Sequence, residues 1–232
     1  MEKQKYAAIV LAAGSGKRMN SKVHKQYLII QDRPVLYYSL KAFEDSAVDE
    51  IVLVVGKGEE EFCRKEIVDK YGISKVKAIV EGGKERYHSV FEGLKQTSDA
   101  DYVLIHDGAR PFVNQDIIRR CMQEVQKYQA CVVGMPVKDT IKIADEEGYA
   151  KQTPDRKNVW MIQTPQTFSY ALIYEAYEEM LKTEDTAITD DAMVLERIKG
   201  KKSKLIEGSY RNIKITTPED LLIANAYLKH PE

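Results

Sequence analysis

The segment Tyr6–Ala12, YAAIVLA, and the residues behind it, AGSGKRMNSKVHKQY (13–27), decide the fold. An unbroken apolar run of this length is typical of a strand that is buried on both faces of a parallel sheet. Gly14 and Gly16 then break the run, and basic side chains follow at Lys17, Arg18, Lys22, His24 and Lys25. The segment therefore predicts a first strand whose carboxyl end carries a glycine loop rich in positive charge.

The rest of the chain repeats this alternation of strand and helix. Apolar strand-like runs lie at Glu50–Val55, 77–80, 102–106, 130–135, Lys204–Glu207 and 212–215. Helical patterns lie at 34–44, 59–71, 85–96, 116–128, 170–182, 190–199 and after Pro218. The alternation predicts an α/β fold: a doubly wound, mostly parallel, Rossmann-like sheet with helices on both faces and ligands at the carboxyl ends of the strands.

Residues 136–163 interrupt this rhythm. Two β-type runs, 140–144 and 149–152, flank a turn-like segment, which predicts a hairpin that projects from the main sheet. We call residues 137–158 the arm, and we expect it to belong to a single domain that spans residues 1–232. Because a lone hairpin is marginal in water, we expect the arm to pack on a second subunit and to serve dimerisation.

Charge and composition exclude several classes of protein. The 232 residues carry a formal net charge of −1, which argues against a general nucleic-acid binder and a polybasic membrane anchor. No apolar run approaches the ~20 residues of a membrane span. The cysteines Cys63, Cys121 and Cys131 form no CxxC or metal-binding spacing, so they predict reduced thiols and a cytoplasmic location.

The glycine loop is suited to a polyphosphate. It is not the phosphate loop GxxxxGK[ST], and GSGKRM lacks the third glycine of the dinucleotide fingerprint. Arginine forks onto phosphate oxygens and lysine acts as a point charge, so cations beside exposed backbone amides favour a polyphosphate ligand.

Several motifs in register carry a family resemblance. They are LAAGSGKRM (11–19) with HKQY (24–27), GGKERYHSV (82–90), HDGARPF (106–112), PVKDT (136–140), QTPQTF (163–168), TDDA (189–192) and NIKITTPED (212–220). Together they resemble the 2-C-methyl-D-erythritol 4-phosphate cytidylyltransferase family over nearly the whole chain. His24 departs from the family spelling, which usually has proline before the KQ.

The resemblance implies transfer of a cytidylyl group from CTP to methylerythritol phosphate, with release of pyrophosphate. It implies Mg²⁺ held mainly by phosphates, and a homodimer formed through the arm. Arg18 and Lys25 would stabilise the transition state. The nucleotide would be held by Ala12, Ala13, Gly14, Ser15, Gly16, Gly83, Ser89 and Asp107, of which Asp107 is also a candidate metal ligand. The second substrate would be positioned by Arg110, Thr140, Arg156, Thr164 and Lys214, with Thr140 and Arg156 acting in the neighbouring subunit's site.

Two alternatives remain open at this point. A cytidylyltransferase for another polyol phosphate, such as ribitol 5-phosphate, would share the fold and most of the CTP motifs. A non-catalytic nucleotide-binding module would dispense with transition-state cations, yet Arg18, Lys25, Arg156 and Lys214 are all present.

Overall fold

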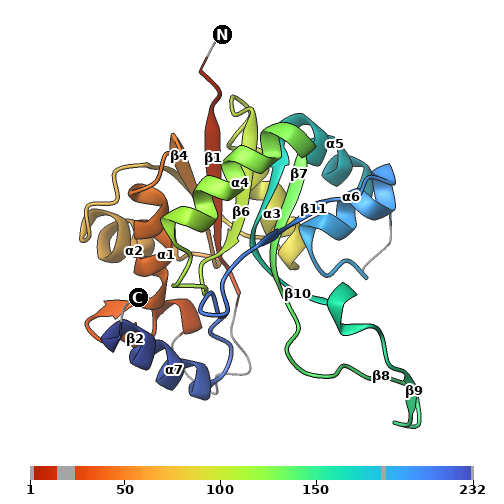
Figure 1. Ribbon diagram of the computed structural model, residues 1–232. Helices are drawn as coiled ribbons and strands as arrows, with labels where there is room; N and C mark the ends of the chain where they lie inside the picture. Colours follow the sequence, from red (N-terminus) through yellow and green to blue (C-terminus); the bar gives the residue numbers. More distant parts are fainter. Residues whose placement is uncertain (1–2, 15–23, 184–186, 231–232) are drawn as a thin grey trace.

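The computed structural model, which describes residues 3–14, 24–183 and 187–230, is built around a seven-stranded sheet (Figure 1). The strand order is β11-β7-β10-β6-β1-β4-β5. The strands are β1 (Tyr6–Ala12), β4 (Glu50–Val55), β5 (Val76–Glu81), β6 (Tyr102–Asp107), β7 (Ala130–Pro136), β10 (Trp160–Ser169) and β11 (Lys204–Glu207). Only β10 runs antiparallel to its neighbours in this sheet, β6 and β7, so the predicted mostly parallel α/β fold is confirmed.

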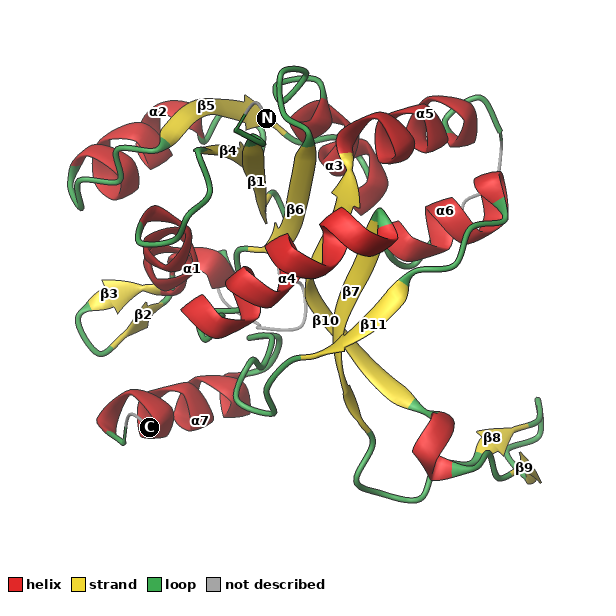
Figure 2. Ribbon diagram, turned by 45° about the horizontal axis from the view of Figure 1, so that its top comes forward, coloured by secondary structure: helices red, strands yellow, loops and turns green. Residues whose placement is uncertain are grey.

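Helices cover both faces of the sheet, which is why its central strands lack apolar–polar alternation. Every residue of β4 is buried. One face packs against α1 (Val35–Glu44), α2 (Glu60–Cys63), η3 (Arg64–Asp69) and α4 (Gln115–Tyr128), and Figure 2 shows α4 crossing in front of the strands. The other face packs against α3 (Arg86–Leu94), α5 (Tyr170–Met180) and α6 (Asp191–Lys199).

The last helix, α7 (Pro218–Lys229), belongs to a smaller apolar cluster. It packs against the short hairpin of β2 (Ile29–Ile30) and β3 (Arg33–Pro34), and Ala224 and Ile30 are fully buried there. Its start is fixed by a capping box between Thr217 and Asp220. This cluster lies at the lower end of the molecule in Figure 1, where the parallel strands end.

The structure differs from the expected elements at residues 212–215 and at β10. The segment 212–215 is not a strand: Ile215 N–H donates to Ala109 O at 2.8 Å, an isolated bond rather than part of a ladder. The long strand β10 was not expected from the sequence. Pro165 cannot donate to a ladder, and the register shifts between Ile162 and Gln166, so the segment lacks a regular strand pattern.

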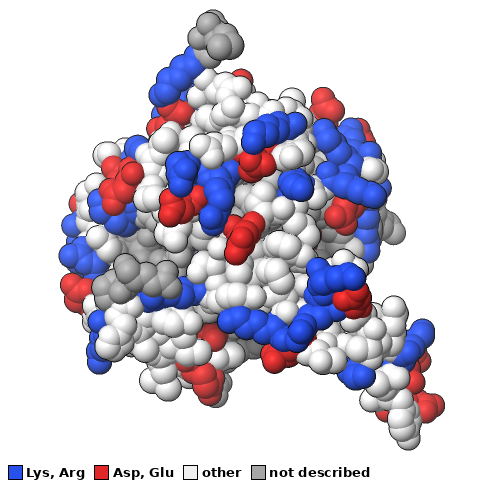
Figure 3. Space-filling model, viewed as in Figure 1, with Lys and Arg blue, Asp and Glu red and all other residues white. Residues whose placement is uncertain are grey.

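The arm contains the predicted hairpin, with shorter strands than expected. β8 (Ile143–Ala144) and β9 (Ala150–Gln152) pair antiparallel, and the one-turn helix η4 (Arg156–Asn158) leads back to the body. The arm stands out from the body (Figure 3), and Tyr149 is 70% exposed. That the arm mediates dimerisation remains a prediction.

The described ranges contain no helix with both the length and the apolar character needed to cross a membrane. The cysteines Cys63, Cys121 and Cys131 are buried and form no disulfide.

Candidate active site

The carboxyl ends of β1, β5 and β6 border a cavity of about 520 Å³. Leu11 pairs in register with Asp107, so the chain that follows Ala12 emerges beside Asp107. The predicted site residues that line the cavity are Ala12, Ala13, Gly14, Lys25, Gly83, Ser89, Asp107 and Lys214. The structure thus brings together residues from four distant parts of the sequence.

Part of the predicted glycine loop cannot be compared with the structure. Ser15, Gly16 and Arg18 lie outside the described residues. Their predicted contributions to the nucleotide site therefore stay predictions.

Asp107 is surrounded by cations. Lys214 Nζ lies 2.9 Å from its carboxylate, Arg110 Nε 3.5 Å and Arg86 Nε 3.6 Å. Arg110 is held in turn by a hydrogen bond from Nη1 to Asn212 O at 2.8 Å. Asp107 is therefore the anchor around which three basic side chains are arranged.

This arrangement keeps Asp107 ionised. Burial alone would raise the pKa of the Asp107 carboxyl, but the charges of Lys214, Arg86 and Arg110 outweigh burial and hold that pKa well below its usual range. A carboxyl group that stays ionised cannot serve as a general acid near neutral pH. In this geometry its carboxylate contacts three cations and can accept hydrogen bonds.

A buried histidine supports Asp107 from the core. His106 is fully buried, and burial lowers its pKa to about 4, so its ring is neutral near pH 7. Because Arg110 O can only accept, His106 Nε2 donates to it at 3.2 Å, which leaves Nδ1 to accept from the Thr164 hydroxyl at 3.0 Å. Thr164 Oγ1 accepts from Asp107 N–H at 3.1 Å. The hydroxyl of Thr164 thus ties β10 to the end of β6 and keeps one acceptor position.

Arg86 is a cavity residue that the sequence analysis missed. Its Nη1 and Nη2 donate to the two oxygens of Asp191 at 2.7 and 2.8 Å, a bidentate pair. Asp191 is fully buried and also accepts from Tyr177 Oη at 2.6 Å. Gln166 Oε1 accepts from the backbone N–H of Asp191 at 3.0 Å. This network fixes the guanidinium beside Asp107, and the motifs that hold Arg86 and Asp191 were the available signal for it.

Replacing Asp191 by asparagine is expected to lower the free energy of unfolding by about 2–3 kcal/mol. Loss of one partner of a fully buried ion pair costs about 3–5 kcal/mol, and the Arg86 side chain, 30% exposed, regains some solvation. Urea unfolding checks this. The control is Asp190→Asn at the N-cap of α6, where asparagine can still accept from Met193 N–H. Equal stability losses in the two variants would contradict the expected buried pair.

Gly82 and Gly83, which follow β5, allow two loops to approach closely. A Cβ on Gly82 would lie 2.6 Å from Ala13 Cβ and 2.7 Å from Ser89 Oγ, and one on Gly83 would lie 2.3 Å from His88 Cβ. The Gly83 N–H donates to Ser89 Oγ at 3.1 Å. Glycine at these positions therefore lets the β5 loop pack directly against the loop after β1.

The description of the chain resumes at His24, and the next residue, Lys25, lines the cavity. Lys25 begins η2 (Lys25–Tyr27), and Gln26 lines the cavity as well. The Gln26 side-chain amide donates to Ala12 O, which joins this turn to the end of β1.

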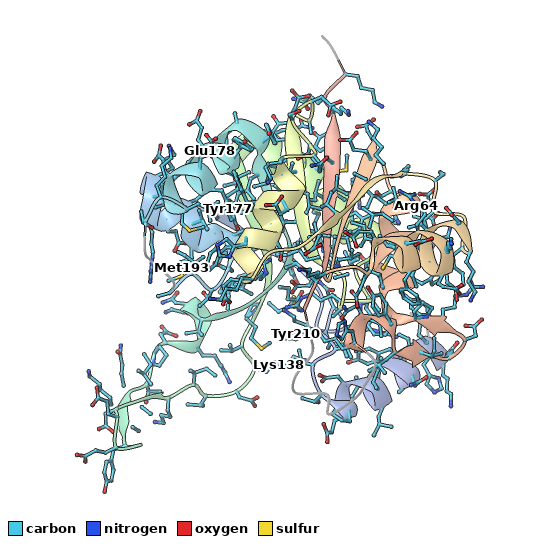
Figure 4. The ribbon with its side chains drawn as sticks, turned by 180° about the vertical axis from the view of Figure 1, so that it is seen from behind. Arg64, Lys138, Tyr177, Glu178, Met193 and Tyr210 are labelled. Carbon is cyan, nitrogen blue, oxygen red and sulfur yellow. The ribbon has the colours of Figure 1, made fainter. Side chains whose placement is uncertain are left out.

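The two predicted arm residues lie away from this cluster. Thr140 and Arg156 are exposed, and Arg156 Nη1 donates to Lys138 O at 2.9 Å. Figure 4 labels Lys138 and Tyr210 at the base of the arm. The Lys138 ammonium lies 3.6 Å from the Tyr210 ring centroid. Tyr210 Oη donates to Pro136 O at 2.8 Å, so the arm is fastened to the loop that carries Lys214.

The chemistry of the described side chains fits a metal ion that arrives with a nucleotide. Across residues 3–14, 24–183 and 187–230, no group of three His, Cys, Asp or Glu side chains could hold a metal ion. Mg²⁺ commonly takes one or two carboxylates and substrate phosphates as ligands. Asp107 is the candidate carboxylate on the cavity wall, so phosphate oxygens would have to supply most of the coordination.

Comparison with known proteins matches the chain to one family over nearly its whole length. Residues 6–230 match the family described as 2-C-methyl-D-erythritol 4-phosphate cytidylyltransferase. The chain is similar to the enzymes of that name from Lachnoclostridium phytofermentans and Lachnospira eligens. The first is 51% identical over 97% of this chain and 97% of the relative. The second is 54% identical over 96% of this chain and 98% of the relative.

Solved structures agree. The 4-diphosphocytidyl-2C-methyl-D-erythritol synthase of Anaerococcus prevotii superimposes with a TM-score of 0.86 at 38% identity, covering 98% of this chain and 97% of that one. The 2-C-methyl-D-erythritol 4-phosphate cytidylyltransferase of Thermus thermophilus gives 0.77 at 30% identity, covering 95% and 98%.

Proposed function

Because the chain belongs to the 2-C-methyl-D-erythritol 4-phosphate cytidylyltransferase family, we propose a mechanism in which its cation cluster carries the transfer. The chain is a cytidylyltransferase that uses CTP and 2-C-methyl-D-erythritol 4-phosphate. A phosphate oxygen of methylerythritol phosphate forms a bond to the α-phosphorus of CTP, the bond from that phosphorus to the β-phosphate oxygen breaks, and pyrophosphate leaves. The ribitol 5-phosphate alternative is not favoured, since the similar proteins carry the methylerythritol name.

The observation that supports this mechanism most directly is the set of basic side chains on the cavity wall. Lys25, Lys214 and Arg86 line the same cavity as the ionised carboxylate of Asp107, and Lys214 and Arg86 contact that carboxylate directly. The attacking group is already an anion, so the reaction needs no strong base. Its difficulty is electrostatic: two anions must meet while negative charge builds around phosphorus. Fixed cations at that point lower the barrier.

CTP would occupy the cavity with its phosphates toward Lys25. Backbone groups of Ala12, Ala13 and Gly14 would line the triphosphate, together with Ser15, Gly16 and Arg18. Gly83 and Ser89, at the start of α3, would hold the cytosine. Small side chains on these loops support this reading because they let the backbone approach the ligand. Lys25 and Arg18 would then neutralise charge at the α-phosphate.

Methylerythritol phosphate would lie on the Asp107 side. Lys214 is 34% exposed there and can turn its ammonium toward an incoming phosphate. Arg110 and Thr164 both contact Asp107, and through it they would hold the shape of this wall. Thr164 itself is buried.

Arg156 and Thr140 would complete this subsite from the arm of the neighbouring subunit. Their exposure, and that of the apolar side chains Ile143 and Tyr149, supports an arm that is covered in a homodimer. The chain 1–232 would then be one catalytic domain, and residues 137–158 its dimerisation element.

Asp107 and the nucleotide phosphates would hold Mg²⁺, which when bound would neutralise part of the triphosphate charge. The residues of this chain supply the remaining positive charge from Lys25, Arg18 and Lys214. Reduced cysteines in the core support a cytoplasmic location.

Pyrophosphate release by the purified chain with CTP and Mg²⁺ tests the function. Turnover is expected with methylerythritol phosphate and not with ribitol 5-phosphate. Turnover with ribitol 5-phosphate alone would overturn the assignment of the second substrate and leave the CTP site in place.

A further inference from the structure

The turn that carries Lys25 cannot fix its own position. η2 spans only Lys25–Tyr27 and contains few internal bonds: Tyr27 N–H donates to His24 O at 2.9 Å and Leu28 N–H to Lys25 O at 3.4 Å. A helix this short is not stable by itself in water. Whatever holds the Lys25 ammonium at the cavity must therefore come from other parts of the chain.

One carboxylate, that of Glu59, contacts both ends of this turn. Glu59 Oε1 lies 2.7 Å from His24 Nδ1, on the residue before Lys25. The two atoms are not aligned as a hydrogen bond, so the contact is an ion pair when the imidazole is protonated. Glu59 Oε2 accepts from Tyr27 Oη at 2.8 Å, on the last residue of the turn.

Glu59 is itself anchored to the sheet. Its Oε2 accepts from Gly56 N–H at 3.0 Å, directly after β4. β4 is the parallel neighbour of β1, so this anchor lies next to the strand end that Gln26 contacts through Ala12 O. Hydrogen bonds thus hold the turn at Tyr27, through Glu59, and at Gln26, through β1, and Glu59 also contacts His24 at the other end of the turn.

Tyr27 is suited to be the fixed end of this clamp. Burial, together with the neighbouring Cys63 and Glu59, raises the pKa of its phenol far above the usual range, so the hydroxyl keeps its proton and donates. Its ring packs edge-on against Phe62 of α2 with centroids 5.1 Å apart. The Tyr27 side chain is therefore held in place by ring packing on one side and by its hydrogen bond to the Glu59 carboxylate on the other.

We propose that Glu59 is a positioning residue for Lys25, a step that rests on the proposed action of Lys25 at the α-phosphate. Its carboxylate clamps the two ends of the His24–Tyr27 turn and keeps the ammonium between them on the cavity wall. His24 stands where the family usually has proline, and it makes a contact to Glu59 that proline could not make. Glu59 is not among the residues that line the cavity, so it would act only through the turn.

A double-mutant cycle between Glu59 and Lys25 tests this. Glu59→Ala is expected to lower kcat about tenfold, since small displacements of a catalytic group are costly, and to change the KM for CTP less. Glu59→Gln keeps an acceptor for Tyr27 and is expected to recover most of that loss. In a Lys25→Ala background, Glu59→Ala should lower kcat no further, because residues that act through one another are not additive.

The matched control is Glu61→Ala. Glu61 lies two residues further along, in α2. Its side chain is 80% exposed and pairs with Lys65 at 2.7 Å, so its loss should leave kcat unchanged. Equal losses from Glu59→Ala with and without Lys25, or no loss in the wild-type background, would overturn the proposal.

A second readout does not depend on turnover. The rate at which Lys25 is acetylated in the ligand-free protein, followed by mass spectrometry, should rise several-fold in Glu59→Ala. The rate at Lys84, which also lines the cavity, should not change. An unchanged rate at Lys25 would overturn the positioning role even if the wild type showed no transferase activity. Absence of wild-type turnover with a raised rate at Lys25 would instead count against the proposed function alone.

Discussion

Lys25→Ala is expected to lower kcat for pyrophosphate release by about 10²–10³ while leaving the thermal unfolding midpoint almost unchanged. Lys25 lines the cavity beside the loop after β1, where the triphosphate would bind. A preorganised cation at the α-phosphate acts mainly in the transition state, so kcat should fall more than the affinity for CTP. Steady-state kinetics and calorimetric titration with CTP measure the two effects separately.

The matched control for Lys25 is Lys84→Ala. Lys84 also lines the cavity, but it is an exposed residue on the loop after β5. If position and not total charge governs the rate, this variant should retain kcat within about tenfold. Similar losses in the two variants would show that the cavity needs only positive charge.

Arg156→Ala is expected to lower kcat/KM for methylerythritol phosphate by about 10² or more, with CTP binding unchanged. This is a large effect for an exposed side chain whose described hydrogen bond goes to Lys138 O, within the arm. It follows only if the arm of one subunit reaches the second-substrate pocket of the other.

Lys157→Ala is the control for Arg156. Lys157 is the next residue of η4, is 78% exposed and pairs with Asp155 at 3.0 Å. Both variants should remain dimers by sedimentation, and Lys157→Ala should keep full activity. A normal kcat/KM in Arg156→Ala would remove Arg156 from the site.

The sequence predicted the sheet where burial is uniform. β1, β4 and β6 are continuous apolar runs because helices cover both faces, and such runs are visible in one dimension. β10 was not predicted because Pro165 and the polar side chains beside it interrupt the apolar pattern that is typical of a strand. Its place between β6 and β7 depends on pairing across the sheet, which no local pattern encodes.

Several site residues that lie in recognisable motifs were predicted from the sequence. Residues whose positions depend on contacts with distant parts of the chain were missed. Lys25, Asp107 and Lys214 were expected and do line one cavity. Arg86 was missed because its position depends on Asp191, 105 residues away, and the two motifs that contain these residues do not reveal that their side chains pair. Glu59 was missed for the same reason: it looks like one more charge on a surface helix.

The most direct test of the shared site is to mix inactive Lys25→Ala protein with inactive Arg156→Ala protein and measure pyrophosphate release after verified subunit exchange. In a heterodimer, one site receives both substitutions and the other receives neither. Random exchange of equal amounts should therefore restore about a quarter of wild-type activity, since about half of the dimers are mixed and each has one intact site. No recovery after exchange would contradict a site completed by the neighbouring subunit and would leave the fold and the CTP cavity as described.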